Sequence, residues 1–130
     1  MAYNILIVDD SRTARAFIAK ALEIAGIEIG AVFEAENGKQ ALDVLHTHWI
    51  DVVLADINMP EMSGLEMVQQ MKRDGLMKTV PVIIVSTERS VIRIAELKAA
   101  GVRDYLNKPF TPENIKETVE RILGGKNPAT

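Results

Sequence analysis

Apolar residues along this chain alternate between two patterns, short continuous runs and longer segments with helical spacing. Residues 5–8, 52–55 and 82–85 are continuous apolar runs, which are typical of parallel strands covered on both faces. Two weaker runs, residues 31–35 and 102–106, also carry charged side chains. The pattern therefore predicts five strands, of which the first, third and fourth are the most deeply buried.

The segments between these runs place apolar residues at helical spacing, which predicts five amphipathic helices. Ser11 precedes the first helix, and Thr111-Pro112 precedes the last. Both are typical start signals, a capping hydroxyl or a cap followed by a first-turn proline. The helical spacing covers residues 14–25, 41–45, 65–71, 91–100 and 115–123.

Strands that alternate with helices in this way predict a parallel sheet with helices on both faces. The most apolar strands belong in the middle of that sheet. The second strand carries Glu34, and the fifth carries Arg103 and Asp104, so both suit the edges. We therefore expect an α/β fold, a flavodoxin-like doubly wound five-stranded parallel sheet in the known order 2-1-3-4-5, with five helices.

The length of the chain sets the number of domains. Its 130 residues and 14.3 kDa suffice for one domain and leave no room for a second compact core. With 48% hydrophobic and 25% charged residues, its composition is that of an ordinary globular domain. We expect the domain to span residues 1–124 and residues 125–130 to form a flexible tail.

Charge, cysteine content and hydrophobic length exclude several classes of function. The 15 lysines and arginines against 18 acidic residues give a net charge of −3, which offers no basic surface to nucleic acid or anionic lipid. The chain has no cysteine, which excludes disulfides, thiolate metal sites and cysteine nucleophiles. It shows neither a membrane span nor a secretion signal. We expect a cytoplasmic monomer that binds neither nucleic acid nor membrane.

Polar residues follow the strands at the carboxyl edge of the predicted sheet, where open parallel sheets bind ligands. Taken alone, each is more typical of a helix cap or a turn. Together they place three carboxylates, two hydroxyls and an ammonium on one rim. They are Asp9 and Asp10 after the first strand, Asp56 after the third, Ser86 and Thr87 after the fourth, and Asn107 and Lys108 after the fifth.

Three carboxylates in one crevice repel one another unless a cation joins them. Because the set offers hard oxygen ligands and neither histidine nor cysteine, it favours Mg²⁺. An acidic rim alone would repel the phosphate of a flavin, which argues against a flavin site. Once Mg²⁺ and Lys108 are present, the local charge reverses and the site can accept a phosphoryl group.

Four motifs, in this order, resemble the receiver domain of two-component response regulators. Each motif alone is unspecific, but four in register on a predicted five-fold alternation of strand and helix are specific. The order and spacing match over residues 4–123. The motifs are the pair Asp9-Asp10, the loop of residues 56–64 (DINMPEMSG), the triplet Val85-Ser86-Thr87, and the triplet Lys108-Pro109-Phe110.

The resemblance implies that Asp56 is the phosphoacceptor, which takes a phosphoryl group from a phosphohistidine of a sensor histidine kinase. It also implies that Mg²⁺ is held by Asp10, by Asp9 partly through water, by Asp56 and by the backbone carbonyl of Asn58. These roles agree with the physics of phosphoryl transfer, which depends mostly on positioning and on neutralising charge.

The resemblance assigns further roles around the acceptor. Lys108 would bind one phosphoryl oxygen, and the Ser86 hydroxyl would bind another. The bond between Lys108 and Pro109 would be cis. Tyr105 resembles the switch aromatic of the fifth strand, which turns inward when the hydroxyl is drawn to the phosphoryl group. An ordinary half-buried strand tyrosine is the alternative.

At two positions the chain resembles the chemotaxis-type (CheY-like) single-domain receivers in particular. Asn58 lies two residues after the acceptor, and Glu88 lies two residues after Ser86. In that group these positions govern access of hydrolytic water, so we expect a short-lived acyl phosphate. Only six residues follow Gly124, so we expect the signal to leave through a partner-binding surface.

The fourth helix indicates where that surface lies. Apolar residues cover more of its circumference than a core-facing stripe needs, so we expect exposed apolar surface around Ile94, with deeper burial as the alternative. The output face would combine this helix with the fifth strand, including Tyr105, and the last helix. Thr87 and Glu88 lie beside it. The kinase is expected to dock near Arg12, Arg15 and Pro109.

Several alternative functions stay open at this point. Within the family, the chain could be a phosphorelay intermediate or a receiver that regulates its own kinase. From another class, an aspartyl-phosphate phosphatase of the haloacid dehalogenase type also uses Asp and Mg²⁺ on a parallel sheet. That enzyme would carry a second Asp where this chain has Asn58. A third alternative is an interaction domain that does not depend on phosphorylation. We therefore expect a signalling protein, and an enzyme only towards its own phosphoryl group.

Overall fold

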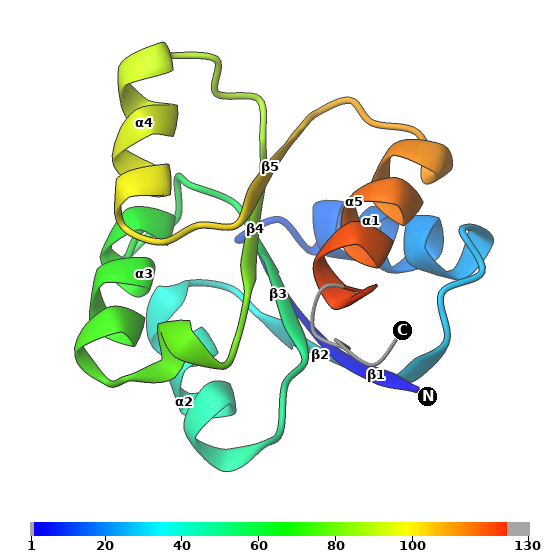
Figure 1. Ribbon diagram of the computed structural model, residues 1–130, viewed down its shortest axis with the longest axis horizontal. Coiled ribbons are helices and arrows are strands. Elements are labelled where there is room, and N and C mark those ends of the chain that lie inside the picture. The colour runs from blue at the N-terminus through cyan, green and yellow to red at the C-terminus, as the bar shows by residue number, and fades with distance from the viewer. Residues whose placement is uncertain (1, 125–130) are drawn as a thin grey trace.

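The computed structural model describes residues 2–124 and consists of one sheet between two layers of helices (Figure 1). Residues 125–130, predicted to form a flexible tail, lie outside the described residues, as does residue 1. The sheet has five parallel strands in the order β2-β1-β3-β4-β5, which confirms the predicted fold class. The strands are β1 (Tyr3–Val8), β2 (Ile29–Ala35), β3 (Val52–Ala55), β4 (Val82–Ser86) and β5 (Asp104–Asn107).

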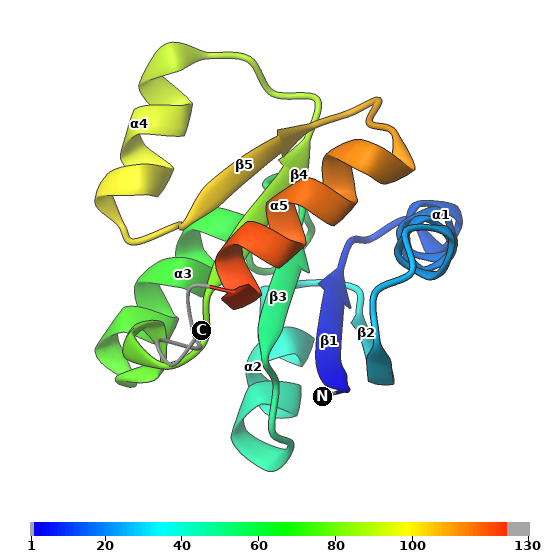
Figure 2. The ribbon, with the colours of Figure 1, turned by 45° about the vertical axis from the view of Figure 1, so that its right-hand side comes forward.

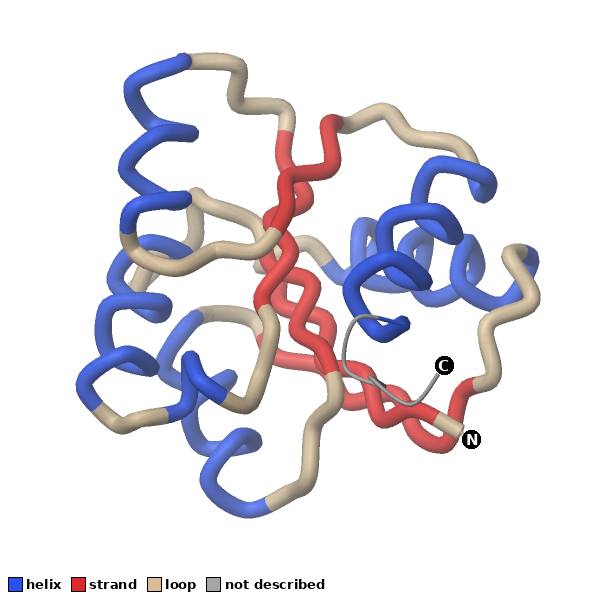
Figure 3. The backbone as a smooth tube through the Cα atoms, in the orientation of Figure 1, coloured by secondary structure: helices blue, strands red, loops and turns tan. Residues whose placement is uncertain are grey.

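Helices cover both faces of the sheet, two on one side and three on the other (Figures 1 and 3). The first and last helices, α1 and α5, share a face and pack against each other. No helix among the described residues is long and apolar enough to cross a membrane. The helices are α1 (Arg12–Ile24), α2 (Gly38–Thr47), α3 (Gly64–Arg73), α4 (Val91–Ala99) and α5 (Pro112–Gly124), with a short 3-10 helix at Leu76–Lys78.

The hydrophobic core explains the order of the strands. Every residue of β3 and β4 is buried, as is β1 from Ile5 onward. Partly buried and exposed residues alternate along β2 until its buried last residue, Ala35, and β5 has one buried residue, Leu106. The three most apolar strands therefore lie in the middle, because only a central strand loses both faces to helices.

Polar caps begin the first and last helices where the sequence predicts them. The Ser11 hydroxyl accepts a hydrogen bond from the Ala14 N–H over 3.1 Å. At the start of α5, the Thr111 hydroxyl accepts one from the Asn114 N–H, also over 3.1 Å. Each bond satisfies a backbone donor that has no partner inside the helix. The cap at Ser11 also fixes where α1 leaves the loop that carries Asp9 and Asp10.

The fifth strand begins later than the sequence predicts, at Asp104 instead of residue 102. The reason is the end of α4, where Gly101 adopts a φ of +111°. The Val102 N–H then turns back to the Leu97 carbonyl over 3.1 Å. Val102 therefore closes the helix and does not open the strand.

The parallel sheet brings the ends of distant strands together. In Figure 2 the strands run upward, so their carboxyl ends meet along one edge. Val8, the last residue of β1, pairs with Ala55, the last residue of β3. Ser86 at the end of β4 pairs with Asn107 at the end of β5. The residues that follow these strands are therefore neighbours.

Candidate functional site

Three carboxylates lie together at the carboxyl edge of the sheet. Asp9, Asp10 and Asp56 each place an oxygen within 4.8 Å of the others. Asp9 is buried, Asp56 is partly buried and Asp10 is exposed, so the cluster opens to solvent on one side. No other group of three metal-ligating side chains of this kind occurs in residues 2–124.

Asp9 is held by hydrogen bonds on its backbone and its side chain. Its N–H donates to the Ala35 carbonyl over 3.0 Å, which extends the pairing of β1 with β2 by one residue. Its Oδ1 accepts from the Ser11 N–H over 2.9 Å. Its Oδ2 accepts from the Lys108 ammonium, also over 2.9 Å. Asp9 is consequently the most rigidly placed acid of the three.

Lys108 brings a positive charge to the acids from the loop after β5. Its Nζ lies 2.9 Å from Asp9 Oδ2 and 4.0 Å from Asp56 Oδ2. The backbone N–H of Lys108 donates to the Ser86 carbonyl over 2.9 Å. The Lys108–Pro109 bond is cis, as the resemblance implies. The ammonium therefore lies between two of the acids and closer to Asp9.

Burial raises the pKa of Asp56, because the partly buried carboxylate loses water that would stabilise its charge. The Asp9 charge adds to this effect. The Lys108 ammonium, the Ile57 N–H and the Ser86 hydroxyl lower the pKa again, but by less. The Ile57 N–H donates to Asp56 Oδ1 over 2.8 Å. Asp56 thus carries a charge that its surroundings only partly compensate.

Ser86, Glu88 and Tyr105 form a continuous path away from Asp56. Ser86 is buried at the end of β4, and its Oγ accepts from the Glu88 N–H over 3.2 Å. The Tyr105 hydroxyl donates to the Glu88 carbonyl over 2.6 Å. Burial raises the pKa of Tyr105, whose ring is partly buried against the core. Thr87, between Ser86 and Glu88, is exposed.

The loop between β3 and α3 carries Asn58, which is exposed. Two contacts that the sequence did not reveal hold this loop. Glu61, at a φ of +63°, accepts from Asn37 Nδ2 over 3.1 Å. The Gly64 N–H donates to the Ile57 carbonyl over 2.7 Å. The asparagine–glycine pair at residues 37–38 indicates a turn in the sequence, but nothing there points to a partner in this loop.

Residues 5–120 match the family model of the response regulator receiver domain. The chain belongs to this family. It is 40% identical over 122 residues to the chemotaxis protein CheY1 of Helicobacter pylori, covering 93% of this chain and 97% of that protein. It is 39% identical over 120 residues to the chemotaxis protein CheY of Pseudomonas aeruginosa, covering 92% and 95%.

Solved structures give the same result for the fold. The chemotaxis response regulator CheY4 of Vibrio cholerae has a TM-score of 0.83 and 35% sequence identity to this receiver. The alignment covers 95% of this chain and 100% of that one. The likenesses therefore show the receiver fold and the signalling class of this chain.

The three residues expected near the docked kinase have different surroundings in this receiver. Arg12 and Pro109 are exposed. Arg15 is only 8% exposed, and its guanidinium donates to the Asp9 carbonyl and to Glu34. Arg15 therefore offers almost no surface to a partner. The helical spacing of α1 could have shown this, since Arg15 falls beside the apolar stripe that includes Ile18.

A mostly apolar hollow of about 350 Å³ lies beside the acid cluster, between the start of α1 and the loop after β5. Phe17 is 57% exposed at this hollow, and its ring centroid lies 5.5 Å from that of Phe110. Ser11 and Lys108, which both contact Asp9, line it as well. The hollow therefore adjoins the residues around Asp56.

The exposed apolar surface of α4 is not where the sequence places it. Ile94 is partly buried, so the prediction that exposure centres on it is wrong. Val91 and Ile92, in the first turn, are 81% and 74% exposed. Leu97 is the one buried residue of the helix. The apolar surface thus lies about one turn nearer the start of α4 than predicted.

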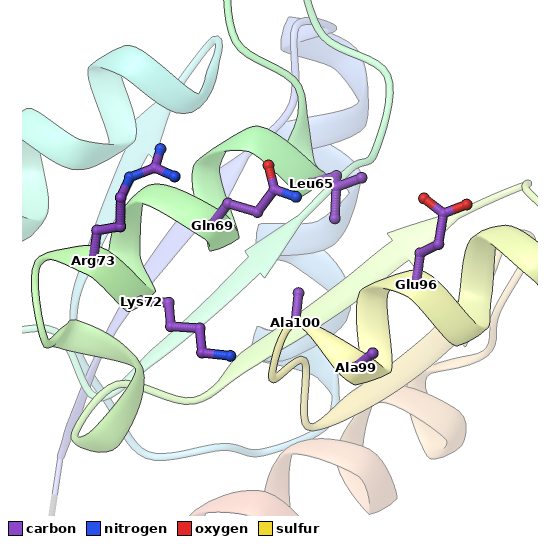
Figure 4. Close-up of a pocket in the computed structure, with 7 residues that line it drawn as sticks. All are labelled: Leu65, Gln69, Lys72, Arg73, Glu96, Ala99 and Ala100. Atoms are coloured by element: carbon purple, nitrogen blue, oxygen red, sulfur yellow. The ribbon is translucent and has the colours of Figure 1, made fainter.

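Between α3 and α4 the surface is hollowed again, over about 670 Å³ (Figure 4). Lys72 and Arg73 come from α3, while Ala99 and Ala100 come from the end of α4. None of the predicted site residues lines this hollow.

Proposed function

We propose that this receiver is a phosphorylation-dependent signalling switch in which Asp56 accepts a phosphoryl group from a phosphohistidine of a sensor histidine kinase. An oxygen of the Asp56 carboxylate bonds to phosphorus while the P–N bond of the phosphohistidine breaks and leaves its electron pair on the imidazole. The product is an acyl phosphate. The observation that carries this proposal is the position of Asp56 between two other carboxylates and the Lys108 ammonium.

The donor atoms of the cluster fit Mg²⁺. Carboxylate oxygens are the ligands that this ion prefers, and it takes only a few of them while keeping several waters. Asp10 and Asp56 would bind it together with the backbone carbonyl of Asn58. Both carboxylate oxygens of Asp9 already accept hydrogen bonds, which fits a contact partly through water. Bound Mg²⁺ would neutralise the carboxylates and the phosphoryl oxygens.

Lys108 and Ser86 would hold the phosphoryl group once it is attached. The Lys108 ammonium is 4.0 Å from Asp56 Oδ2, so a phosphoryl group on Asp56 would give it a second anionic partner beside Asp9. The Ser86 hydroxyl already interacts with Asp56 and would donate to another phosphoryl oxygen. Charge-assisted bonds of this kind are stronger than neutral ones.

We infer a chemotaxis-type role. About 40% identity to chemotaxis proteins supports it, and so do Asn58 and Glu88. Asn58 is exposed beside the cluster, and Glu88 is partly buried next to Ser86. Both side chains would control how water reaches and hydrolyses the acyl phosphate. The expected outcome is a phosphoryl group that the protein itself removes soon after it is attached.

The signal would leave through the face formed by α4, β5 and α5. Tyr105 on β5 links this face to Ser86 through the backbone of Glu88. Val91 and Ile92 supply exposed apolar surface on α4, and such surface is typical of a protein contact. A change at Ser86 would therefore reach a surface that a target protein can bind.

The kinase would approach the hollow between the start of α1 and the loop after β5, and not the proposed output face. Arg12 and Pro109 are exposed there, and the hollow at Phe17 would receive an apolar side chain of the kinase. Any donor to Asp56 has to come close to this surface, since Lys108 lines both the hollow and the acid cluster.

Family membership bears on the alternatives. The match to the receiver model over residues 5–120, with Asn58 in place of the second Asp, argues against the phosphatase. The intact acid cluster argues against an interaction domain that does not use phosphorylation. Within the family, a phosphorelay intermediate or a receiver that regulates its own kinase is the alternative to the chemotaxis role.

Intact-protein mass spectrometry after incubation with Mg²⁺ and acetyl phosphate tests the proposal. We expect the mass of one phosphoryl group to be added to the wild type, and no addition to Asp56→Asn or in the presence of EDTA. Turnover of phosphate esters without an adduct would support the phosphatase instead. No adduct with any small phosphodonor would contradict the proposal.

A further inference from the structure

We propose that Arg15 is a positioning residue for the Mg²⁺ site, which it controls by holding the backbone of Asp9 against the edge strand β2. This inference rests on the proposed function, since it assumes that the acid cluster binds Mg²⁺. We call the hydrogen bonds from Arg15 to Asp9 and to Glu34 the Arg15 bridge.

The Arg15 bridge consists of two short hydrogen bonds from one guanidinium. Nη1 donates to the Asp9 carbonyl over 2.7 Å, and Nε donates to Glu34 Oε1 over 2.8 Å. The side chain of Arg15 is only 9% exposed. Arginine is rarely so buried unless it is paired. Its burial here is therefore explained by what it binds at each end.

The bridge is the contact that joins the Asp9 carbonyl to the rest of the fold. The Asp9 N–H is bound to Ala35, and its carboxylate is bound to Ser11 and Lys108. With Arg15 on the carbonyl, the peptide between Asp9 and Asp10 cannot rotate without breaking a bond. That peptide sets the direction in which the exposed Asp10 leaves the chain.

Metal affinity depends on this kind of support. Groups that hold the ligands in place, without touching the ion, typically change metal affinity by about 10- to 100-fold. Asp10 has little burial of its own to fix it. If the Asp9–Asp10 peptide is free to turn, Asp10 has to be ordered at the moment Mg²⁺ binds, which weakens binding.

Arginine suits this position better than lysine. A guanidinium donates in two directions from a rigid plane, so it can bind the Asp9 carbonyl and Glu34 at the same time. Glu34 lies on β2 opposite Ile7 of β1. It therefore anchors the far end of the bridge to a strand that is itself paired with the strand leading into Asp9.

Calorimetric titration of the full chain with MgCl₂ tests the inference, together with the melting temperature of each variant. We expect Arg15→Met to bind Mg²⁺ about 10- to 100-fold more weakly than the wild type. Arg15→Lys should lose less Mg²⁺ affinity than Arg15→Met, and Glu34→Met should lose less than Arg15→Lys. The double variant Arg15→Met/Glu34→Met should be no weaker than Arg15→Met alone, because Glu34 acts through Arg15.

The matched control is Lys20→Met, which removes one positive charge from the exposed side of the same helix. It should leave Mg²⁺ affinity within about twofold of the wild type, which separates the bridge from a general change in net charge. All titrations are run below the onset of melting, so that a loss of stability alone does not alter the measured affinity.

The outcomes separate the inference from the proposed function. If the wild type binds Mg²⁺ and all bridge variants bind it within about twofold as tightly, the Arg15 inference is overturned and the proposed function stands. An equal loss in Lys20→Met also overturns it. If Arg15→Met does not fold, the Mg²⁺ affinities of Arg15→Lys and Glu34→Met are judged by the same criterion. If the wild type itself binds no Mg²⁺, both fail.

Discussion

The hydroxyl of Tyr105 donates a hydrogen bond to the backbone carbonyl of Glu88 over 2.6 Å. This bond joins β5 to the loop between β4 and α4. The N–H of the same Glu88 donates to Ser86 Oγ, and Ser86 interacts with Asp56. A residue on the proposed output face is therefore linked through the backbone of Glu88 to the side chain that would bind a phosphoryl group.

Replacing Tyr105 by phenylalanine should lower the stability of the fold without changing phosphorylation. The variant loses one hydrogen bond, so the free energy of unfolding should fall by about 1 kcal/mol. Incorporation of a phosphoryl group from acetyl phosphate should be unchanged, because Tyr105 does not contact Asp56. Urea denaturation and intact mass measure the two effects. Tyr3→Phe, at the start of β1, is the matched control, and an equal loss of stability there would argue against a special role for the Tyr105 bond.

The charge of Asp56 should lower the stability of the Mg²⁺-free protein. Because its pKa is raised in the folded state, ionisation of Asp56 opposes folding. The stability is therefore full below the ordinary pKa of an aspartate, 3.8, and falls as the pH rises through the raised pKa of the folded state. Asp56→Asn should melt a few degrees above the wild type at pH 7 in EDTA, with a gain of about 1 kcal/mol or less for a partly exposed group.

The same comparison at lower pH checks the cause. The difference in melting temperature between Asp56→Asn and the wild type should shrink as the wild-type carboxyl becomes protonated. A difference that does not change with pH, or a variant that melts below the wild type at pH 7, would show that the Asp56 charge is not the destabilising factor.

Gly64 should tolerate no side chain. A Cβ at this position would overlap the Asp56 carbonyl oxygen and lie 3.0 Å from Ile57 Cα. Gly64→Ala should therefore lower the free energy of unfolding by about 1–3 kcal/mol, as overpacking generally does, and reduce phosphoryl incorporation by displacing Asp56. The control is Gly124→Ala, where a Cβ meets nothing within 4 Å. Equal behaviour of the two variants in denaturation and in intact mass would refute this prediction.

Leu97 should be the main attachment of helix α4 to the core. Leu97 is 1% exposed, whereas Ile92 on the same helix is 74% exposed. Leu97→Ala should cost about 2–5 kcal/mol of stability. Ile92→Ala should leave stability nearly unchanged and weaken binding of a target to the phosphorylated protein. Denaturation and hydrogen exchange of α4 amides measure the stability of the two variants. A similar loss of stability in Leu97→Ala and Ile92→Ala would contradict the prediction.

Much of the fold follows from residues that act locally. The apolar runs place the first, third and fourth strands in the middle of the sheet, and the capping side chains Ser11 and Thr111 mark the starts of two helices. The full strand order came from the known order of flavodoxin-like folds, which this ranking fits. The beginning of β5 was missed because it depends on how α4 ends, where the Val102 N–H returns to Leu97. That choice is made by tertiary contacts and not by the sequence of the strand.

The candidate site was predictable in its members but not in their contacts. The sequence places Asp9, Asp56 and Lys108 on one rim, yet it does not show that Lys108 lies closer to Asp9. The burial of Arg15 was missed, although its helical spacing from Ile18 indicates it; its hydrogen-bond partners were not predictable. Its partner Glu34 lies on another strand, and only the folded chain brings the two together.

The central claim is that Asp56 carries the phosphoryl group. Borohydride reduction after incubation with Mg²⁺ and acetyl phosphate converts an acyl phosphate to an alcohol, so a phosphorylated aspartate becomes homoserine. Peptide mass spectrometry then locates it. The account predicts homoserine at position 56 in the wild type, and none in Asp56→Asn. Homoserine at position 9 or 10 in the wild type, or at no position although the protein gained a phosphoryl group, would contradict it.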